Sequence, residues 1–312
     1  MAALRELVEL PDGRRASHEV VGEGEPLLYF QGGPGFSASL LRDDATLLGD
    51  RFAVHLIDPH GSGGSTPPSD AAAYDHLGHA RFYEAVREAL GLERVTVMGI
   101  SFGSIVALTY AALFPGAAER CIAIAARAVG EEEQGVEAEQ EMERMLARHE
   151  HASSYPSARA TWHAWTERVL AATDAREVDA MMAEVLPLYT AHPERPGVRR
   201  LIDAWRSEAK SDLAAAKAWE AGLYQTIDVR PLLGRVRCPT LLLVGALDLI
   251  CGPAHSEAIA RAIPDAKVVT VPDSGPLHPR RGPGGVPSGG RVLLRRPPAG
   301  RCGPGVSPVA AR

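Results

Sequence analysis

The sequence predicts an α/β protein whose mostly parallel sheet carries helices on both faces and is interrupted by a helical insertion. Short apolar strands alternate with helices over residues 1–128, an order typical of a parallel sheet between two helix layers. Residues 129–233 then read as helical throughout, and the alternation resumes at 234. Hydrophobic residues make up 46% of the 312 positions, which is enough to bury a large core.

The first strands are separated by Pro-Asp-Gly at 11–13 and Gly-Glu-Gly at 22–24, so we expect an antiparallel entry into the sheet. The strands predicted after these are buried apolar runs, and the helix predicted at Tyr74–Leu90 is amphipathic. The predicted strands are Leu4–Leu10, Ala16–Val21, Pro26–Phe30, Phe52–Ile57, Arg94–Met98, Arg120–Ala125, Thr240–Val244 and Lys267–Val271, and the predicted core helices are Tyr74–Leu90, Phe102–Phe114 and Ala254–Ile263.

Composition divides the chain further. The insertion begins with the acidic run Glu131–Glu133 and holds all four tryptophans, Trp162, Trp165, Trp205 and Trp219. The 37 residues of 276–312 contain eight Pro, eight Gly, seven Arg and no acidic residue, and without apolar periodicity they are expected to be disordered. We therefore expect a core of 1–128 and 234–275, a helical insertion of 129–233, and a tail of 276–312.

Charge and cysteine content exclude several classes of protein. The net charge is −6, and without the seven arginines of the tail the first 275 residues carry 26 basic and 39 acidic residues. Such an acidic chain argues against nucleic-acid and anionic-membrane partners. No apolar run approaches the roughly 20 residues of a membrane span, and charges interrupt the first ten residues too often for a signal peptide. The cysteines at 121, 238, 251 and 302 are too scattered for a disulfide framework or metal pair. We expect a cytoplasmic protein without metal or cofactor.

A serine motif lies between a predicted strand and a predicted helix. Residues Gly99-Ile100-Ser101-Phe102-Gly103 match G-x-S-x-G, in which the glycines permit a sharp turn that exposes the serine oxygen. The turn also aims the N-terminus of the next helix at that oxygen. We therefore predict that Ser101 is a catalytic nucleophile, and a structural turn serine is the alternative.

A glycine-rich turn upstream is the candidate oxyanion hole. Residues 31–35 read Gln-Gly-Gly-Pro-Gly and end a strand, and small residues there let backbone amides approach a substrate oxygen. We expect the amides of Gly33 and Phe102 to hold the oxyanion of a tetrahedral intermediate, with Gly32 as the alternative donor to Gly33.

Asp248 is the candidate acid of a catalytic triad. It follows strand Thr240–Val244, and the chain order Ser, acid, His is that of a hydrolase whose carboxylate orients the histidine. A capping or turn aspartate is the alternative. His60, in the glycine-rich loop Asp58–Ser65, is considered as a base, but we expect it to be structural, like the histidines at 55, 76 and 79.

These motifs resemble those of the α/β-hydrolase superfamily, and most closely its proline iminopeptidase-like branch. That branch carries H-G-G-P-G, a D-x-R-G-x-G-x-S loop, a serine elbow and a helical cap between two strands. The resemblance covers 4–275 and implies an α/β-hydrolase fold in which 129–233 is a cap that covers Ser101 and decides substrate choice. The chain departs from the branch pattern with glutamine at 31, histidine at 60, and Ile100 and Phe102 in the elbow.

The position expected for the catalytic histidine holds a proline. The branch has Gly-His after its last strand, whereas here Gly275 is followed by Pro276, Leu277 and His278. His278 is therefore the remaining candidate base. It lies two positions late and beside a proline, although a catalytic histidine must be fixed within reach of the serine.

A shifted reading frame is our hypothesis for this departure. In one permitted set of codons for residues 275–287, removing a single C after the first codon gives Gly-His-Phe-Thr-His-Val-Glu-Ala-Pro-Glu-Glu-Phe. This reading restores Gly-His and then the Glu and Pro that open a final helix in the family. We expect 276–312 to come from a shifted frame, and the present chain to hydrolyse its substrate slowly.

The resemblance implies a serine hydrolase that cleaves a small amide or ester through an acyl-enzyme, first of all an aminopeptidase that removes N-terminal proline from short peptides. Ionised carboxylates would hold the substrate amine, and the seven acids within Glu131–Glu143 are the candidates. A solvated helix face is the alternative for those acids. A carboxylesterase or lactonase with an apolar pocket is the second hypothesis. A hydrolase-fold protein with a broken triad is the third, and the oligomeric state is left open.

Overall fold

The computed structural model describes residues 5–129, 143–144, 146–147, 150–151, 155–193, 196–208, 211–248 and 250–275. Several predictions lie outside these residues. They are the disorder and shifted frame of 276–312, the base His278 and the proline at the expected base position, and six of the seven acids that were candidates for holding a substrate amine.

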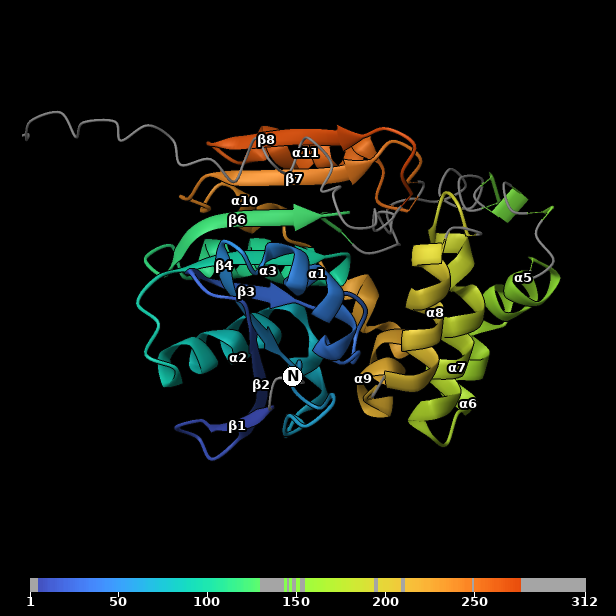
Figure 1. Ribbon diagram of the computed structural model, residues 1–312, viewed down its shortest axis with the longest axis horizontal. Helices are drawn as coiled ribbons and strands as arrows, with labels where there is room; N and C mark the ends of the chain where they lie inside the picture. Colours follow the sequence, from blue (N-terminus) through green and yellow to red (C-terminus); the bar gives the residue numbers. More distant parts are fainter. Residues whose placement is uncertain are drawn as a thin grey trace, which may run out of the picture.

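One mixed sheet forms the centre of the described chain (Figure 1). Its eight described strands run in the order β1-β2-β4-β3-β5-β6-β7-β8. From β4 through β3 to β8 every neighbouring pair is parallel, which confirms the predicted mostly parallel sheet. The strands are β1 Glu6–Glu9, β2 Arg15–Val21, β3 Glu25–Phe30, β4 Phe52–Ile57, β5 Val95–Ile100, β6 Ala118–Ile124, β7 Thr240–Gly245 and β8 Ala266–Val271.

The antiparallel part of the sheet contains a different third strand from the one that the sequence predicts. β2 is antiparallel to β1 and to β4, whereas β3 pairs in parallel with β4 and β5. The reason is that β4 lies between β2 and β3. The chain can leave β2 and pass around β4 because Gly22 and Gly24 have φ values of 82° and 127°. A Cβ on Gly22 would lie 2.2 Å from the Cα of Gly49, so the turn needs glycine there.

Helices cover both faces of the sheet, as predicted. α2, α3, α10 and α11 surround one hydrophobic cluster, which includes Phe30, Tyr83 and Tyr110. α1 contributes to a second cluster on the opposite face of β3 and β4, which includes Leu27 and Ala45. The bounds of these helices are α1 Arg42–Leu48, α2 His76–Ala89, α3 Phe102–Leu113, α10 Arg230–Leu233 and α11 Pro253–Ala262.

The short helix α1 is absent from the sequence prediction, and one predicted helix begins later. α1 has seven residues, too few to show a helical period. α2 begins at His76 because Asp75 accepts a hydrogen bond from the Gly78 amide at 2.6 Å, which caps the helix. A separate short helix, Ala71–Tyr74, precedes it. Within the described residues, no helix combines the length and apolar composition needed to cross a membrane.

Between β6 and β7 the described chain is helical and has a hydrophobic cluster of its own, with Val178, Leu186 and Trp205 buried in it. Figure 1 shows α5–α9 beyond the arrowheads of β6–β8. α10 falls inside 129–233 but packs against α3 and α11, and the division into core and insertion stays a prediction. The elements of this segment are α5 Tyr155–His163, α6 Trp165–Ala171, α7 Ala175–Val185, α8 Pro196–Glu208 and α9 Leu213–Ala218, with short 3₁₀ or π turns at Leu186–Tyr189, Trp219–Leu223 and Tyr224–Thr226.

Candidate active site

Ser101 occupies a sharp turn between β5 and α3. Its φ of 52° and ψ of −124° are unusual for a residue with a side chain, a conformation that costs about 1–3 kcal/mol. The glycines of the motif make the turn possible. A Cβ on Gly99 would lie 1.9 Å from the Gly103 carbonyl oxygen, and one on Gly103 would lie 2.3 Å from the Phe30 carbonyl oxygen. The Ser101 amide donates to the Ile124 carbonyl at 2.9 Å, and the residue is exposed at the N-terminus of α3.

The glycine-rich turn after β3 lies against this serine. A Cβ on Gly32 would be 2.8 Å from the Ile100 carbonyl oxygen and 3.3 Å from the Cβ of Ser101. Gly33 has a φ of 73°, and a Cβ there would be 2.2 Å from the Phe36 ring. The backbone of residues 32 and 33 therefore passes beside the candidate nucleophile, as an oxyanion hole requires. The choice between the amides of Gly33 and Gly32 stays a prediction, as does the role of the Phe102 amide.

Asp248 is a buried carboxylate with one oxygen unused. The residue is 2% exposed. Its Oδ1 accepts hydrogen bonds from the amides of Ile250 at 3.0 Å and Cys251 at 2.7 Å. Its Oδ2 is buried and has no hydrogen-bond partner in the described part of the chain. Burial raises the pKa of Asp248 to about 6, although the two amides and the charge of Arg127 act in the opposite direction. The free oxygen suits an N–H donor such as an imidazole.

Ser101 and Asp248 lie at the same edge of the sheet. Ser101 follows β5 and Asp248 follows β7, with β6 between the two strands. Neighbouring strands are about 4.8 Å apart, so the two backbones are separated by roughly 10 Å. A histidine side chain placed between them would span this gap. This placement is compatible with a triad, and the catalytic roles of the two residues stay predictions.

The chain after β8 passes over the end of β7. The Leu247 amide donates to the Ser274 carbonyl at 2.8 Å. A Cβ on Gly245 would be 2.3 Å from the Ser274 oxygen and 2.5 Å from the Gly275 oxygen. Leu247 directly precedes Asp248, so Ser274 and Gly275 contact the loop that carries the candidate acid. Position 276 comes directly after Gly275 in the chain. That position holds a proline, which has no imidazole to bridge serine and acid.

His79 packs against Phe102, and His60 packs against His79. The rings of His60 and His79 are 4.2 Å apart, and those of His79 and Phe102 are 5.3 Å apart. Burial lowers the pKa of His60 to about 4 and also lowers the pKa values of His76 and His79. Neutral, buried rings of this kind fit the structural interpretation made from the sequence. His55 is likewise buried, and its Nδ1 lies 2.9 Å from the His18 Nε2.

Two polar residues at this edge, His192 and Arg127, are absent from the sequence-based predictions. The His192 Nε2 lies 2.7 Å from an oxygen of Asp273, beside the end of β8. Arg127 follows β6 and is 6% exposed. No sequence signal marks His192, which lies between β6 and β7. Arg127 could have been found as a lone charge at the end of an apolar strand, the position at which Ser101 and Asp248 were found.

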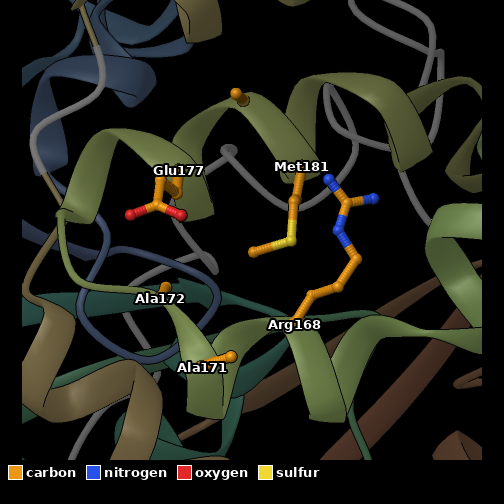
Figure 2. Close-up of a pocket in the computed structure, with 6 residues that line it drawn as sticks. Arg168, Ala171, Ala172, Glu177 and Met181 are labelled. Atoms are coloured by element: carbon orange, nitrogen blue, oxygen red, sulfur yellow. The ribbon is translucent and has the colours of Figure 1, made fainter.

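The described residues also hold two surface hollows, and neither includes a candidate catalytic residue. One, of about 350 Å³, lies between α6 and α7, and Figure 2 shows Arg168 and Met181 reaching into it. The other, of about 330 Å³, is lined by Ala112, Leu113, Pro115, Arg235 and Arg237. Among the described side chains, no group of three or more His, Cys, Asp and Glu could hold a metal ion.

Replacing Asp248 with asparagine is expected to raise the free energy of unfolding at pH 8 by about 1–3 kcal/mol. The folded-state pKa of about 6 lies above the ordinary 3.8, so at pH 8 the charge destabilises only the folded chain. The gain should fall to roughly half at pH 5 and vanish below pH 3.8, where the carboxyl is protonated in both states. Urea unfolding at pH 8 and pH 5 measures both values.

The matched control is Asp174→Asn, because the exposed Asp174 has a lowered pKa and should gain nothing from loss of charge. A gain for Asp248→Asn that is absent at pH 8, or equal at both pH values, would contradict the prediction.

Known proteins share this architecture. The profile of the alpha/beta hydrolase fold matches residues 25–277. The pimeloyl-[acyl-carrier protein] methyl ester esterase of Chromobacterium violaceum is 26% identical over 263 residues, which cover 82% of this chain and 89% of the esterase. The proline iminopeptidase of Clostridium botulinum is 25% identical over 256 residues, which cover 80% of this chain and 82% of that enzyme. A crystal structure of a hydrolase from Pseudomonas aeruginosa PA01 has a TM-score of 0.63 at 23% identity and covers 87% and 91% of the two chains.

Proposed function

Because the chain belongs to the alpha/beta hydrolase fold family, and is similar to its proline iminopeptidase-like branch, we propose that it is a serine hydrolase with Ser101 as the nucleophile. The observation that supports this most is the strained, exposed turn of Ser101 between β5 and α3, two strands from the buried Asp248. A serine with only a structural role gives no reason for such strain.

The proposed reaction passes through an acyl-enzyme. The Ser101 Oγ attacks the carbonyl carbon of an ester or amide while a base takes the hydroxyl proton. The amides of Gly33 and Phe102 hold the oxyanion of the tetrahedral intermediate. The bond to the leaving alcohol or amine then breaks, and the base returns its proton to that group. Water repeats the sequence on the acyl-enzyme and releases the acid, while the Oδ2 of Asp248 orients the base.

We further propose that this chain lacks that base because residues 276–312 come from a shifted reading frame. The unpartnered Oδ2 of Asp248 supports this, since a triad histidine would donate to it. The position of the Ser274 and Gly275 carbonyls over β7 also supports it. In the restored frame a histidine follows Gly275 directly, beside the loop of the acid.

The face of the sheet opposite α11 gives independent support for the shifted frame. Ile122, Leu243 and Val269 lie on adjacent strands of that face and are each only partly buried. The restored reading continues with Glu-Ala-Pro-Glu-Glu-Phe, which can open a helix. A closing helix packed on this apolar face would remove it from water.

We propose that residues 129–233 form a cap that decides which substrate is cleaved. Two aromatic contacts support this placement. The Trp205 ring lies 4.9 Å from Phe36, which follows the oxyanion turn. The Trp219 ring lies 4.9 Å from Phe102, which follows the nucleophile.

The first candidate substrate is a short peptide with N-terminal proline, and it rests on the similarity to proline iminopeptidases. The second is a small carboxylic ester or lactone. The second is favoured by Glu143, the one described candidate for holding a substrate amine, because it pairs with Arg159 at 3.2 Å and its side chain is 46% exposed. The esterase relative covers 82% of this chain and the iminopeptidase 80%, so coverage does not separate the two candidates.

Kinetics with matched substrates separates the two candidates. For an aminopeptidase we expect proline 4-nitroanilide to be cleaved with a kcat/KM at least about tenfold above that of its N-acetyl derivative, because the free amine contributes binding. Faster cleavage of 4-nitrophenyl butyrate, with no effect of N-acetylation, would favour the esterase instead. Ser101→Ala protein, purified in the same way, gives the background rate.

A further inference from the structure

Arg127 is a buried cation without a described partner. The residue comes three positions after β6 and is 6% exposed. Its Nε and Nη2 atoms are buried and make no hydrogen bond in the described part of the chain. Buried charges in proteins are normally paired and hydrogen-bonded. An arginine in this state therefore points to a ligand that supplies the missing acceptors.

The backbone places Arg127 at the edge of the sheet that carries the candidate catalytic residues. The Ala125 amide donates to the Leu243 carbonyl of β7 at 2.9 Å. The Ala128 carbonyl accepts from the Val229 amide at 2.8 Å. The Ser101 amide donates a hydrogen bond to the Ile124 carbonyl, and Arg127 follows Ile124 by three residues.

Asp248 does not neutralise this arginine. The charge of Arg127 acts on Asp248 and on Cys251, so the guanidinium is near the loop after β7. Yet the Oδ2 of Asp248 and two nitrogens of Arg127 each remain without a hydrogen bond to a described residue. The two groups are therefore near enough for their charges to interact, yet they share no hydrogen bond. An anion could bond to the guanidinium and leave the carboxylate free for a base.

We propose that Arg127 binds a carboxylate carried by the substrate. The planar guanidinium presents two N–H groups in the geometry of a carboxylate, which makes this pair strong and specific. The first 275 residues carry 26 basic and 39 acidic residues, so this cation is not part of a generally basic surface. The inference rests on the proposed function and names its substrate class. The carboxylate is either the C-terminus of a short peptide or the free acid of a half-ester.

Binding to the full 312-residue chain tests this without requiring turnover. Isothermal titration compares prolylglycine with prolylglycinamide, and monomethyl glutarate with dimethyl glutarate. In at least one pair, we expect the compound with the free carboxylate to bind about tenfold or more tightly than its neutral partner. The pair that shows this preference identifies the source of the carboxylate. Arg127→Met should abolish the preference and Arg127→Lys should reduce it. Arg168→Met, which removes an arginine whose side chain is 44% exposed, should leave it unchanged.

Three outcomes would each overturn the proposal. They are equal affinities within both pairs, a preference that survives Arg127→Met, and dissociation constants above about 1 mM for all four compounds. If Arg127→Met does not fold, the comparison within each pair and the Arg127→Lys variant decide. Labelling of Ser101 with a fluorophosphonate, measured on the protein with the restored reading frame, reports on the proposed function separately. A carboxylate preference with no labelling would contradict the serine hydrolase and leave the role of Arg127 standing.

Discussion

Removing one C after the Gly275 codon, which restores the reading frame with Gly-His, is expected to raise kcat/KM for small esters or amides by about 10³–10⁶-fold over the present chain. The restored frame supplies a histidine next to the loop of Asp248, whose Oδ2 is buried and has no described partner. It also replaces a tail without acidic residues by a sequence able to form a closing helix. The effect is large because Ser101 is a weak nucleophile without a base that takes its proton.

The measurement compares two genes that differ by one C after the Gly275 codon. Pro276→His in the present chain is the intermediate control, since it adds the imidazole without the closing helix and should recover part of the rate. His278→Ala and His192→Ala in the present chain are expected to change little. Full activity of the present chain that disappears in His278→Ala would show that this histidine is the base. Sequencing of the gene that confirms the present frame would also reject the hypothesis.

In the restored-frame protein, Ser101→Ala is expected to abolish labelling by a fluorophosphonate and to lower kcat by about 10⁴–10⁶-fold. The phosphonate forms a covalent bond to the nucleophile, so its attachment reports on Ser101 directly. KM should change much less than kcat, because the hydroxyl acts mainly in the transition state. Intact-mass spectrometry and steady-state kinetics measure the two effects.

The matched control for that substitution is Ser207→Ala, which removes a serine of α8 whose hydroxyl donates to the Asp203 carbonyl at 2.9 Å. It should leave labelling and kcat unchanged. Labelling that persists in Ser101→Ala would place the nucleophile elsewhere and would remove the basis of the triad assignment.

Local sequence patterns predict most of the elements that hold this site. Phe52–Ile57 is observed at the predicted residues because a short apolar run between polar turns has few other ways to be buried. Gly99, Ser101 and Gly103 predict the strained turn, since only glycine tolerates the backbone contacts on both sides of the serine. The four-residue α10 shows the limit of such patterns, because its position depends on packing against α3 and α11.

By itself the sequence determined the parallel sheet, the turn of Ser101 and the strand end that carries Asp248, because each depends on a few adjacent residues. It also showed that position 276 holds proline. Only the tertiary structure decided how these parts meet. The Leu247–Ser274 hydrogen bond brings the end of β8 onto the loop of Asp248. Burial, which no local pattern reveals, then raises the pKa of Asp248 and leaves Arg127 without a described partner. Both effects arise because strands distant in the chain are adjacent in the sheet and exclude water between them.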